Sequence, residues 1–222
     1  MAMVFPLPRA EFLNLLRVQE VRFQLDLQRQ ITGLAGGEIL SAEVAPPLWR
    51  GAVSLAPMKK RTAAEVQALM AMLEAPGRSF EAYKAQQVGP AADPQGAALT
   101  GFAPQLAEVH SADPARIKLN QLPPSYELSA GDFLAFSYDN GSGARRALHQ
   151  VVQGRAADAT GATASYLTVT PALRAGATAG AAVDLLRPHC LAVLVPGSVS
   201  YGITRGNTTS GMGFEFRQTL RG

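Results

Sequence analysis

The class of fold is decided by residues 126–153, which read YELSAGDFLAFSYDNGSGARRALHQVVQ. Two runs rich in apolar residues, 133–138 and 146–153, flank the sequence NGSG at 140–143. Asn and Gly tolerate the positive φ angles that tight hairpin turns require. A further turn leads into a third run at 165–170. This order of strands and turns predicts an antiparallel β meander or a small barrel.

Residues 20–31 show the alternation of a long strand. The apolar side chains fall on one face: Val21, Phe23, Leu25, Leu27 and Ile31. The polar side chains fall on the other: Arg22, Gln24, Asp26, Gln28 and Gln30. Because successive side chains of a strand point to opposite faces, one face of this strand is expected to pack against other apolar residues and the other to be exposed to solvent.

A second strand is predicted at 39–55, after a glycine-rich turn at 33–37. Pro46 and Pro47 interrupt it, so this strand is expected to bend there or to run along an edge of its sheet. The two strands together predict a long hairpin. Further strands are predicted at 191–195 and at 211–220, with a hairpin turn over 206–213, and the alternation of 211–220 repeats that of the first strand.

One helix is predicted, over residues 62–74. Thr62 and Glu65 have the spacing of a capping box, in which two side chains satisfy free backbone donors at a helix start. Four apolar residues at helical spacing make a stripe that is expected to pack on the sheet: Val66, Leu69, Met70 and Leu73. Pro76 and Gly77 are expected to end the helix.

These elements predict a mainly β protein with one α-helix and a split organisation. Residues 1–84 and 188–222 are expected to form one β domain that carries the helix at about 62–75. Residues 115–187 are expected to form an inserted small β-barrel. Residues 85–114 are rich in Ala, Pro and Gly and lack periodicity, which predicts an extended linker or arm.

The composition narrows the classes of function. Only 17 % of residues are charged. A surface that largely contacts other proteins would explain this low fraction, and so would a bias toward alanine in the coding sequence. The net charge of +3 is too small and too scattered to predict nucleic-acid binding. The first 16 residues lack the pattern of a secretory signal, and no run of about 20 apolar residues predicts a membrane span. We therefore expect folding in a cytoplasm and no membrane insertion.

No pattern predicts catalysis, a cofactor or a metal. His189 and Cys190 are neighbours in a strand, so their side chains would point to opposite faces and could not form a catalytic pair. Pairing of Cys190 with His110 or His149 would need a tertiary coincidence. The three histidines have no metal-ligand spacing. The glycine-rich segment 206–213 lacks the lysine of a phosphate-binding loop.

Aromatic residues concentrate in the predicted insertion: Tyr126, Phe133, Phe136, Tyr138 and Tyr166. In a small barrel such residues are more often core than surface. An exposed aromatic group could instead stack on sugars. The alternative that residues 115–187 form a glycan-binding module of a cell-surface-recognising protein therefore stays open.

The same block resembles the distal tail protein of long-tailed bacteriophages and prophages, which joins the tail tube to the tail tip. The resemblance covers about a third of the chain. Its positions follow the pattern L-GD-Lh-V-D-G-V-P-LR-G-V-P: Leu128, Gly131, Asp132, Leu148, His149, Val151, Asp158, Gly161, Val169, Pro171, Leu173, Arg174, Gly180, Val183 and Pro188.

This resemblance implies a tail-tube-like β-sandwich that assembles into a ring, usually of six copies, at the distal end of a virion tail. It implies contacts with the tail tube protein and with hub or tail-tip proteins, and assembly in the cytoplasm of a host bacterium. It also implies that the polar positions from Arg22 to Gln30 line a channel through which DNA passes without specific binding. A different hub or baseplate component, such as a threefold hub, would share the fold but differ in symmetry.

Overall fold

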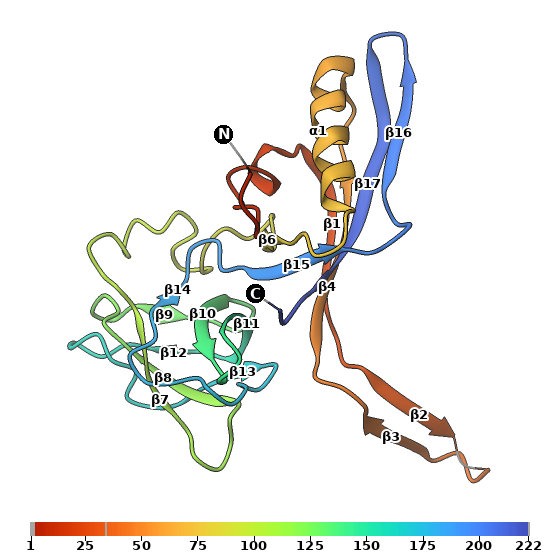
Figure 1. Ribbon diagram of the computed structural model, residues 1–222. Coiled ribbons are helices and arrows are strands. Elements are labelled where there is room, and N and C mark those ends of the chain that lie inside the picture. The colour runs from red at the N-terminus through yellow and green to blue at the C-terminus, as the bar shows by residue number, and fades with distance from the viewer. Residues whose placement is uncertain (1–2, 34, 222) are drawn as a thin grey trace. The chain divides into compact units, whose positions relative to one another are not determined.

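The computed structural model describes residues 3–33 and 35–221. The chain is mainly β, as the sequence predicts: 44 % of residues lie in strands, and the described residues hold one α-helix. The chain divides into two compact units, which are described separately (Figure 1). Unit 1 holds Met1–Asn14, Phe80–Leu191 and Leu220–Gly222, and unit 2 holds Leu15–Ser79 and Ala192–Thr219.

The centre of unit 2 is an antiparallel sheet with the strand order β1-β4-β17-β15. Its strands are β1 (Val18–Asp26), β4 (Leu48–Leu55), β17 (Thr208–Gln218) and β15 (Cys190–Leu194). β15 begins in unit 1, and its residues from Ala192 on pair with β17. β5 (Met58–Lys59) and β16 (Ser200–Arg205) also pair with β17. The turn of the β16–β17 hairpin lies at residues 206–207, a shorter turn than the one predicted over 206–213.

The predicted strand 20–31 is wrong at its C-terminal end. β1 stops at Asp26, and a separate strand, β2 (Arg29–Gly33), pairs with β3 (Ile39–Glu43) in a two-stranded hairpin. The break falls at Gln28, whose φ of 49° belongs to the left-handed region that strands exclude. The predicted interruption at Pro46 and Pro47 is confirmed, because it separates β3 from β4. Leu34, in the predicted turn 33–37, lies outside the described residues.

The apolar face of the unit 2 sheet packs aromatic rings across neighbouring strands. The Phe23 and Trp49 rings stack with their centroids 5.2 Å apart, and the Phe216 ring lies 6.0 Å from the Phe23 ring. Gly51 sits opposite both phenylalanines in the strand register. A Cβ atom at Gly51 would lie 2.4 Å from the Phe216 ring, so only glycine leaves room for this packing.

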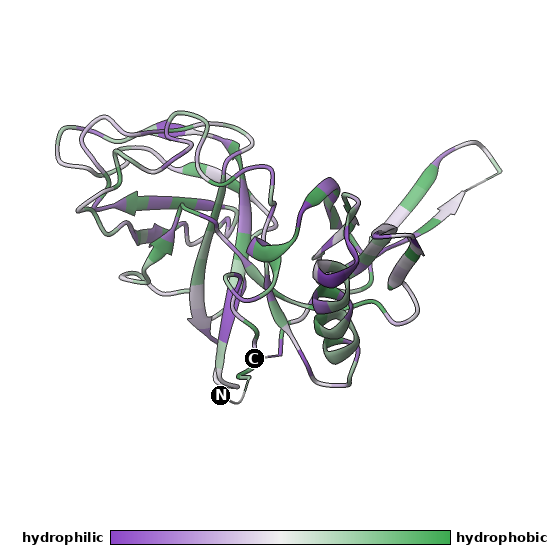
Figure 2. Ribbon diagram, turned by 90° about the horizontal axis from the view of Figure 1, so that it is seen from above, coloured by the Kyte–Doolittle hydropathy of each residue, from purple (hydrophilic) through white to green (hydrophobic). Residues whose placement is uncertain are grey.

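Helix α1 (Lys60–Leu73) belongs to unit 2 and carries the predicted apolar stripe. Val66, Met70 and Leu73 are buried, while Leu69 is half-buried at the margin. Figure 2 shows the apolar and polar residues alternating around this helix. The predicted capping box is wrong, because the helix starts two residues earlier and has no side-chain cap. The Lys60 amide instead donates to the carbonyl of Asn207, at 3.0 Å.

Unit 1 contains a six-stranded antiparallel sheet with the order β14-β10-β11-β13-β8-β7. The predicted strands at 133–138, 146–153 and 165–170 are confirmed within two residues at each end. The bounds are β7 (Gln105–Val109), β8 (Arg116–Asn120), β10 (Phe133–Asp139), β11 (Ala144–Gln153), β13 (Leu167–Thr170) and β14 (Val183–Asp184). A small second sheet pairs β9 (Glu127–Leu128) with β12 (Arg155–Ala156).

The N-terminal segment and β6 (Phe80–Ala82) also belong to unit 1. Leu7 forms a parallel bridge with Phe80, and the Phe12 ring meets the Phe80 ring edge-on, with centroids 5.0 Å apart. A short 3-10 helix, η1 (Leu13–Leu15), ends this segment. Residues 3–14 and 80–84 therefore belong to the same unit as the block predicted to be an insertion, which differs from the expected division of the chain.

The segment 85–114 differs from an extended linker. It contains β7, and both Leu99 and Leu106 lie in the core of unit 1. Its irregular part is held by a buried carboxylate, since Asp93 accepts hydrogen bonds from the amides of Ala97 (2.9 Å) and Ala98 (3.1 Å). A loop ordered in this way needs no periodic sequence, which explains why composition alone suggested a linker.

Candidate functional site

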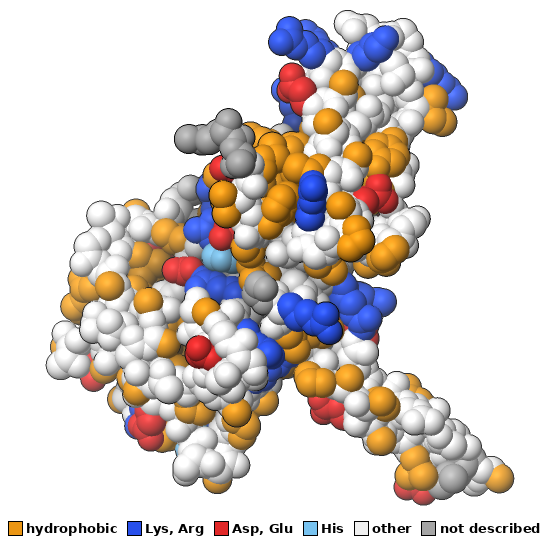
Figure 3. Space-filling model, in the orientation of Figure 1, with side chains coloured by type: hydrophobic (Ala, Val, Ile, Leu, Met, Phe, Trp, Pro, Cys, Tyr) orange, Lys and Arg blue, Asp and Glu red, His pale blue; other side chains and the backbone are white. Residues whose placement is uncertain are grey.

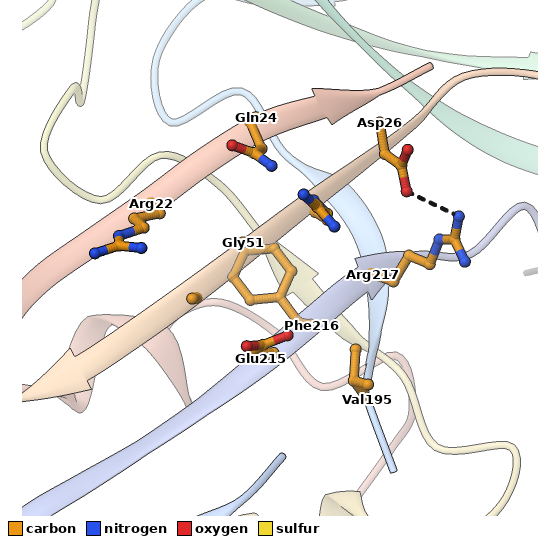
Figure 4. A pocket seen from close by; sticks show the side chains of 10 residues that line it. Arg22, Gln24, Asp26, Gly51, Val195, Glu215, Phe216 and Arg217 are labelled. Atoms are coloured by element: carbon orange, nitrogen blue, oxygen red, sulfur yellow. Dashed lines mark hydrogen bonds and ion pairs between the residues drawn. The ribbon is translucent and has the colours of Figure 1, made fainter. Parts of the chain in front are cut away.

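The polar face of the unit 2 sheet brings together side chains from three strands. Antiparallel register sets Arg22 of β1 beside Ala52 of β4, and Ala52 beside Glu215 of β17. The next row holds Gln24, Arg50 and Arg217 in the same order. Figure 4 shows these residues around one hollow. The term polar face is used below for Glu20, Arg22, Gln24, Asp26, Arg50, Ala52, Glu215 and Arg217.

The hollow exists because Ala52 is the smallest side chain of its row. Longer side chains surround it, and the resulting cavity has a volume of about 350 Å³. Arg22 and Glu215 flank Ala52 on the two neighbouring strands, and Arg50 and Arg217 come from the adjacent row. The site is therefore an open depression whose lining is partly charged and partly apolar, with Val195 and Phe216 among its residues.

The three guanidinium groups of the polar face have polar partners within unit 2. Arg217 Nη2 donates to Asp26 Oδ2 at 3.1 Å, and Arg22 Nε lies 3.3 Å from Glu20 Oε1. With its amide oxygen turned to the guanidinium, Gln24 accepts from Arg50 Nε at 2.7 Å.

These contacts set the electrostatics of the polar face. Arg50 and Arg217 are direct neighbours, and two like charges in that position repel. Asp26 offsets the charge of Arg217, and the neutral Gln24 amide accepts hydrogen bonds from Arg50. Counted over the whole face, three arginines stand against three carboxylates, so no single sign of charge accumulates.

Three of the five strand positions predicted to share a face, Arg22, Gln24 and Asp26, do meet here. Gln28 and Gln30 do not: Gln28 lies at the break after β1, and Gln30 lies in the separate hairpin. Alternation placed Glu215 and Arg217 on one face of their strand, but the sequence does not give the register that brings them to β1.

A second feature of unit 2 is the β2–β3 hairpin, called the arm below (residues 29–43). All ten strand residues of the arm are exposed. Among them are large apolar side chains: Ile31 is 66 % exposed, Ile39 69 % and Leu40 51 %. Figure 1 shows the arm extending beyond the ends of β1 and β4. Such a concentration of exposed apolar residues on a two-stranded element marks an interaction surface.

The cysteine–histidine pairings considered from the sequence do not form. Cys190 is fully buried, and burial raises the pKa of its thiol, which keeps it protonated and unreactive. His189 Nδ1 is instead 2.7 Å from Arg9 Nη1, and its Nε2 is 3.5 Å from Glu81 Oε1. His149 is buried against Phe136, and desolvation lowers its pKa to about 4.

The aromatic residues of the predicted insertion are mostly core. Tyr126, Phe133, Phe136 and Tyr138 are buried, and Tyr166 alone of the five is half-exposed. Both the hydroxyl and the ring of Tyr166 have partners: the hydroxyl donates to Glu108, and Lys118 Nζ lies 4.5 Å from the ring centroid. This arrangement leaves little free ring surface for stacking on a sugar.

Within residues 3–33 and 35–221, no cluster of three or more His, Cys, Asp or Glu side chains is placed to hold a metal ion. No helix of the same residues has the length and hydropathy to cross a membrane. No model of a known protein family and no curated protein matches the chain.

Proposed function

We propose that this chain is a structural subunit of a ring at the distal end of a bacteriophage tail, in the virion. The observation that carries the proposal is the arm. A two-stranded hairpin is marginally stable by itself in water, so an arm with exposed Ile31, Ile39 and Leu40 needs a second surface. Each of these side chains would contribute about 1.5–3 kcal/mol when fully buried. Assembly into a ring supplies that surface.

The polar face supports the same proposal. A face in which Arg22, Arg50 and Arg217 are balanced by carboxylates offers DNA no accumulated positive charge. A strongly basic lining would bind phosphates and slow the passage of DNA. In the proposed ring this face lines the channel, with Arg22, Gln24 and Asp26 among its lining residues. In this proposal the β1-β4-β17 sheet and α1 form the tail-tube-like domain that the sequence resemblance implies.

We also propose that the six-stranded sheet of unit 1 is the small barrel of that resemblance. Hydrogen bonds between its first and last segments support closure. The Leu106 amide donates to the Ala181 carbonyl at 2.9 Å, and the Gly180 amide donates to the Leu106 carbonyl at 2.8 Å. In this proposal the ring contacts the tail tube protein on one side and the hub or tail-tip proteins on the other, with sixfold symmetry. Assembly takes place in the cytoplasm of the host.

Negative-stain electron microscopy of the purified chain, over a range of concentrations, tests the proposal. Closed rings with a central hole wide enough for duplex DNA are expected, and their symmetry is read directly. A matched variant in which the arm is replaced by a short Asn-Gly turn between Asp26 and Leu48 should give single particles only. Dispersed particles of the unaltered chain, with and without tail tube protein, would contradict the ring and would make glycan screening of the full chain the next experiment.

A further inference from the structure

The two ends of unit 2 differ in the sign of their net charge. One end holds four exposed cationic side chains, called the basic end below: Lys59, Lys60, Arg61 and Arg205. Figure 3 shows Lys and Arg side chains gathered over the end of α1 and the turn between β16 and β17. The arm extends from the other end of the β1–β4 hairpin and carries Glu38 and Glu43 with a single cation, Arg29, which lies opposite Glu43 in the strand register.

Backbone hydrogen bonds join the three elements that form the basic end, which are β5, α1 and the β16–β17 turn. Lys59 of β5 pairs with Thr208 of β17, and the Lys60 amide donates to the Asn207 carbonyl in the β16–β17 turn. The first turn of α1 contains no acidic residue, so the positive end of the helix dipole adds to the side-chain charges. Glu65 is 3.8 Å from Arg61, and both side chains are largely exposed, so this pair neutralises little of the charge.

An open strand edge and apolar side chains lie beside these charges. β16 pairs with β17 and, among the described residues, with no other strand. Ile203 of β16 is 63 % exposed, and Tyr201 is also exposed. Exposed strand edges are places where another chain can pair or pack. Part of this edge is covered, because Gln67 Nε2 of α1 donates to the Tyr201 carbonyl at 2.6 Å. The basic end therefore combines positive charge and an apolar side chain with a partly open strand edge.

We infer that the arm of one copy docks on the basic end and the β16 edge of a second copy of this chain. Glu38 and Glu43 then face Lys60 and Arg205, while Ile31 and Ile39, which share one face of the arm, cover Ile203. The inference rests on the proposed ring and names the surfaces that build it. Because the two surfaces are different, the contact is head-to-tail, and such contacts close into a ring when the rotation between copies permits it.

Charge reversal tests this contact in the full chain. One variant reverses the basic end (Lys60→Glu/Arg205→Glu), and one reverses the arm (Glu38→Lys/Glu43→Lys). An acidic residue in the first turn of α1 is favourable to the helix, so the first variant is expected to fold. The control reverses two arginines on the sheet of unit 1 (Arg116→Glu/Arg145→Glu). Circular dichroism checks folding, and sedimentation velocity at several concentrations and salt levels measures association.

Each surface variant should weaken association roughly tenfold or more, since attractive pairs become repulsive, while the control should associate like the unaltered chain. An equimolar mixture of the two variants should recover the oligomer, because opposite charges face each other again at every contact. A single chain carrying all four changes should recover it as well. Variants that associate normally, or a mixture that stays dissociated, would overturn the assigned surfaces while leaving the ring in place. An unaltered chain that stays monomeric at every concentration would overturn both.

Discussion

Acidification from neutral pH to about pH 4 should destabilise unit 1 through His149. This histidine is fully buried in the sheet of unit 1, where its Nδ1–H donates to the Pro171 carbonyl at 2.7 Å. Its Nε2 has no hydrogen-bond partner among the described residues, and its ring stacks on Phe136. Burial, and to a smaller extent the charge of Arg174, lowers its pKa from 6.5 to about 4. The neutral ring is therefore the form that the fold holds.

The sign and size of the effect follow from the two pKa values. The unfolded chain binds a proton at His149 below about pH 6.5, while the folded chain does so only near pH 4. Protons therefore favour the unfolded state over this window, and stability falls as the pH is lowered. At pH 4 the loss amounts to about 3 kcal/mol, since one pKa unit corresponds to about 1.4 kcal/mol. That is a large part of the stability of a typical domain.

Urea unfolding followed by far-UV circular dichroism, repeated across this pH range, measures the effect. The variant His149→Gln keeps a donor for the Pro171 carbonyl and removes the titrating group, so its stability curve should lack this component. The difference between the two proteins isolates His149 from the carboxylates and from the other histidines. A difference that stays constant between neutral pH and pH 4 would refute the reasoning, because it would mean that His149 titrates alike in both states.

Three further predictions concern packing and buried polar groups, each measured by urea unfolding. Gly51→Ala should cost about 1–3 kcal/mol, read from the fluorescence of Trp49, because the new Cβ meets the Phe216 ring, while Gly33→Ala, with open space around it, should be close to neutral. Asp132→Ala should cost about 2 kcal/mol or more, because it leaves the amides of Ala91 and Ser129 without their acceptor, and the same change at the exposed Asp139 should cost less. Val66→Asp should cost about 3 kcal/mol or more by burying a charge under α1, whereas Ala64→Asp on the exposed side should be tolerated; equal stability of the two would show that the stripe does not pack.

Much of the fold was visible in the sequence where side-chain periodicity is regular. The strands around 133–138 and 146–153 follow from apolar runs bounded by turn residues, and the stripe from Val66 to Leu73 follows from a period of 3.6 residues. The break at Gln28 was not visible, because a non-glycine residue adopts the left-handed conformation there without any marker in the local pattern. The capping box failed for a different reason: the backbone of the β16–β17 turn, far away in the sequence, starts the helix earlier.

The candidate sites required information that one sequence does not contain. Alternation assigns Arg22 and Arg217 to polar faces of their own strands, but only the register of β1, β4 and β17 makes them neighbours. The composition of the loop after β6 is typical of a linker, whereas its order comes from the Asp93 carboxylate and from core leucines that follow no periodic spacing. Pairing across long stretches of sequence is a property of the assembled sheet.

The two cationic regions of unit 2, the polar face and the basic end, differ in how far their charges are neutralised within the chain. On the polar face the chain supplies its own partners: the carboxylates of Asp26 and Glu20 contact two of the guanidinium groups, and the neutral amide of Gln24 accepts a hydrogen bond from the third. At the basic end, Glu65 is the one counter-charge among the described residues, with its Oε1 atom 3.8 Å from Arg61 Nε. A surface that must let a polyanion pass benefits from internal neutralisation, because screened and balanced charges hold phosphates weakly. A surface that binds the arm of a second copy attracts that arm more strongly when its own positive charge is not neutralised within the subunit. The two regions therefore suit a channel lining and a subunit contact of one ring.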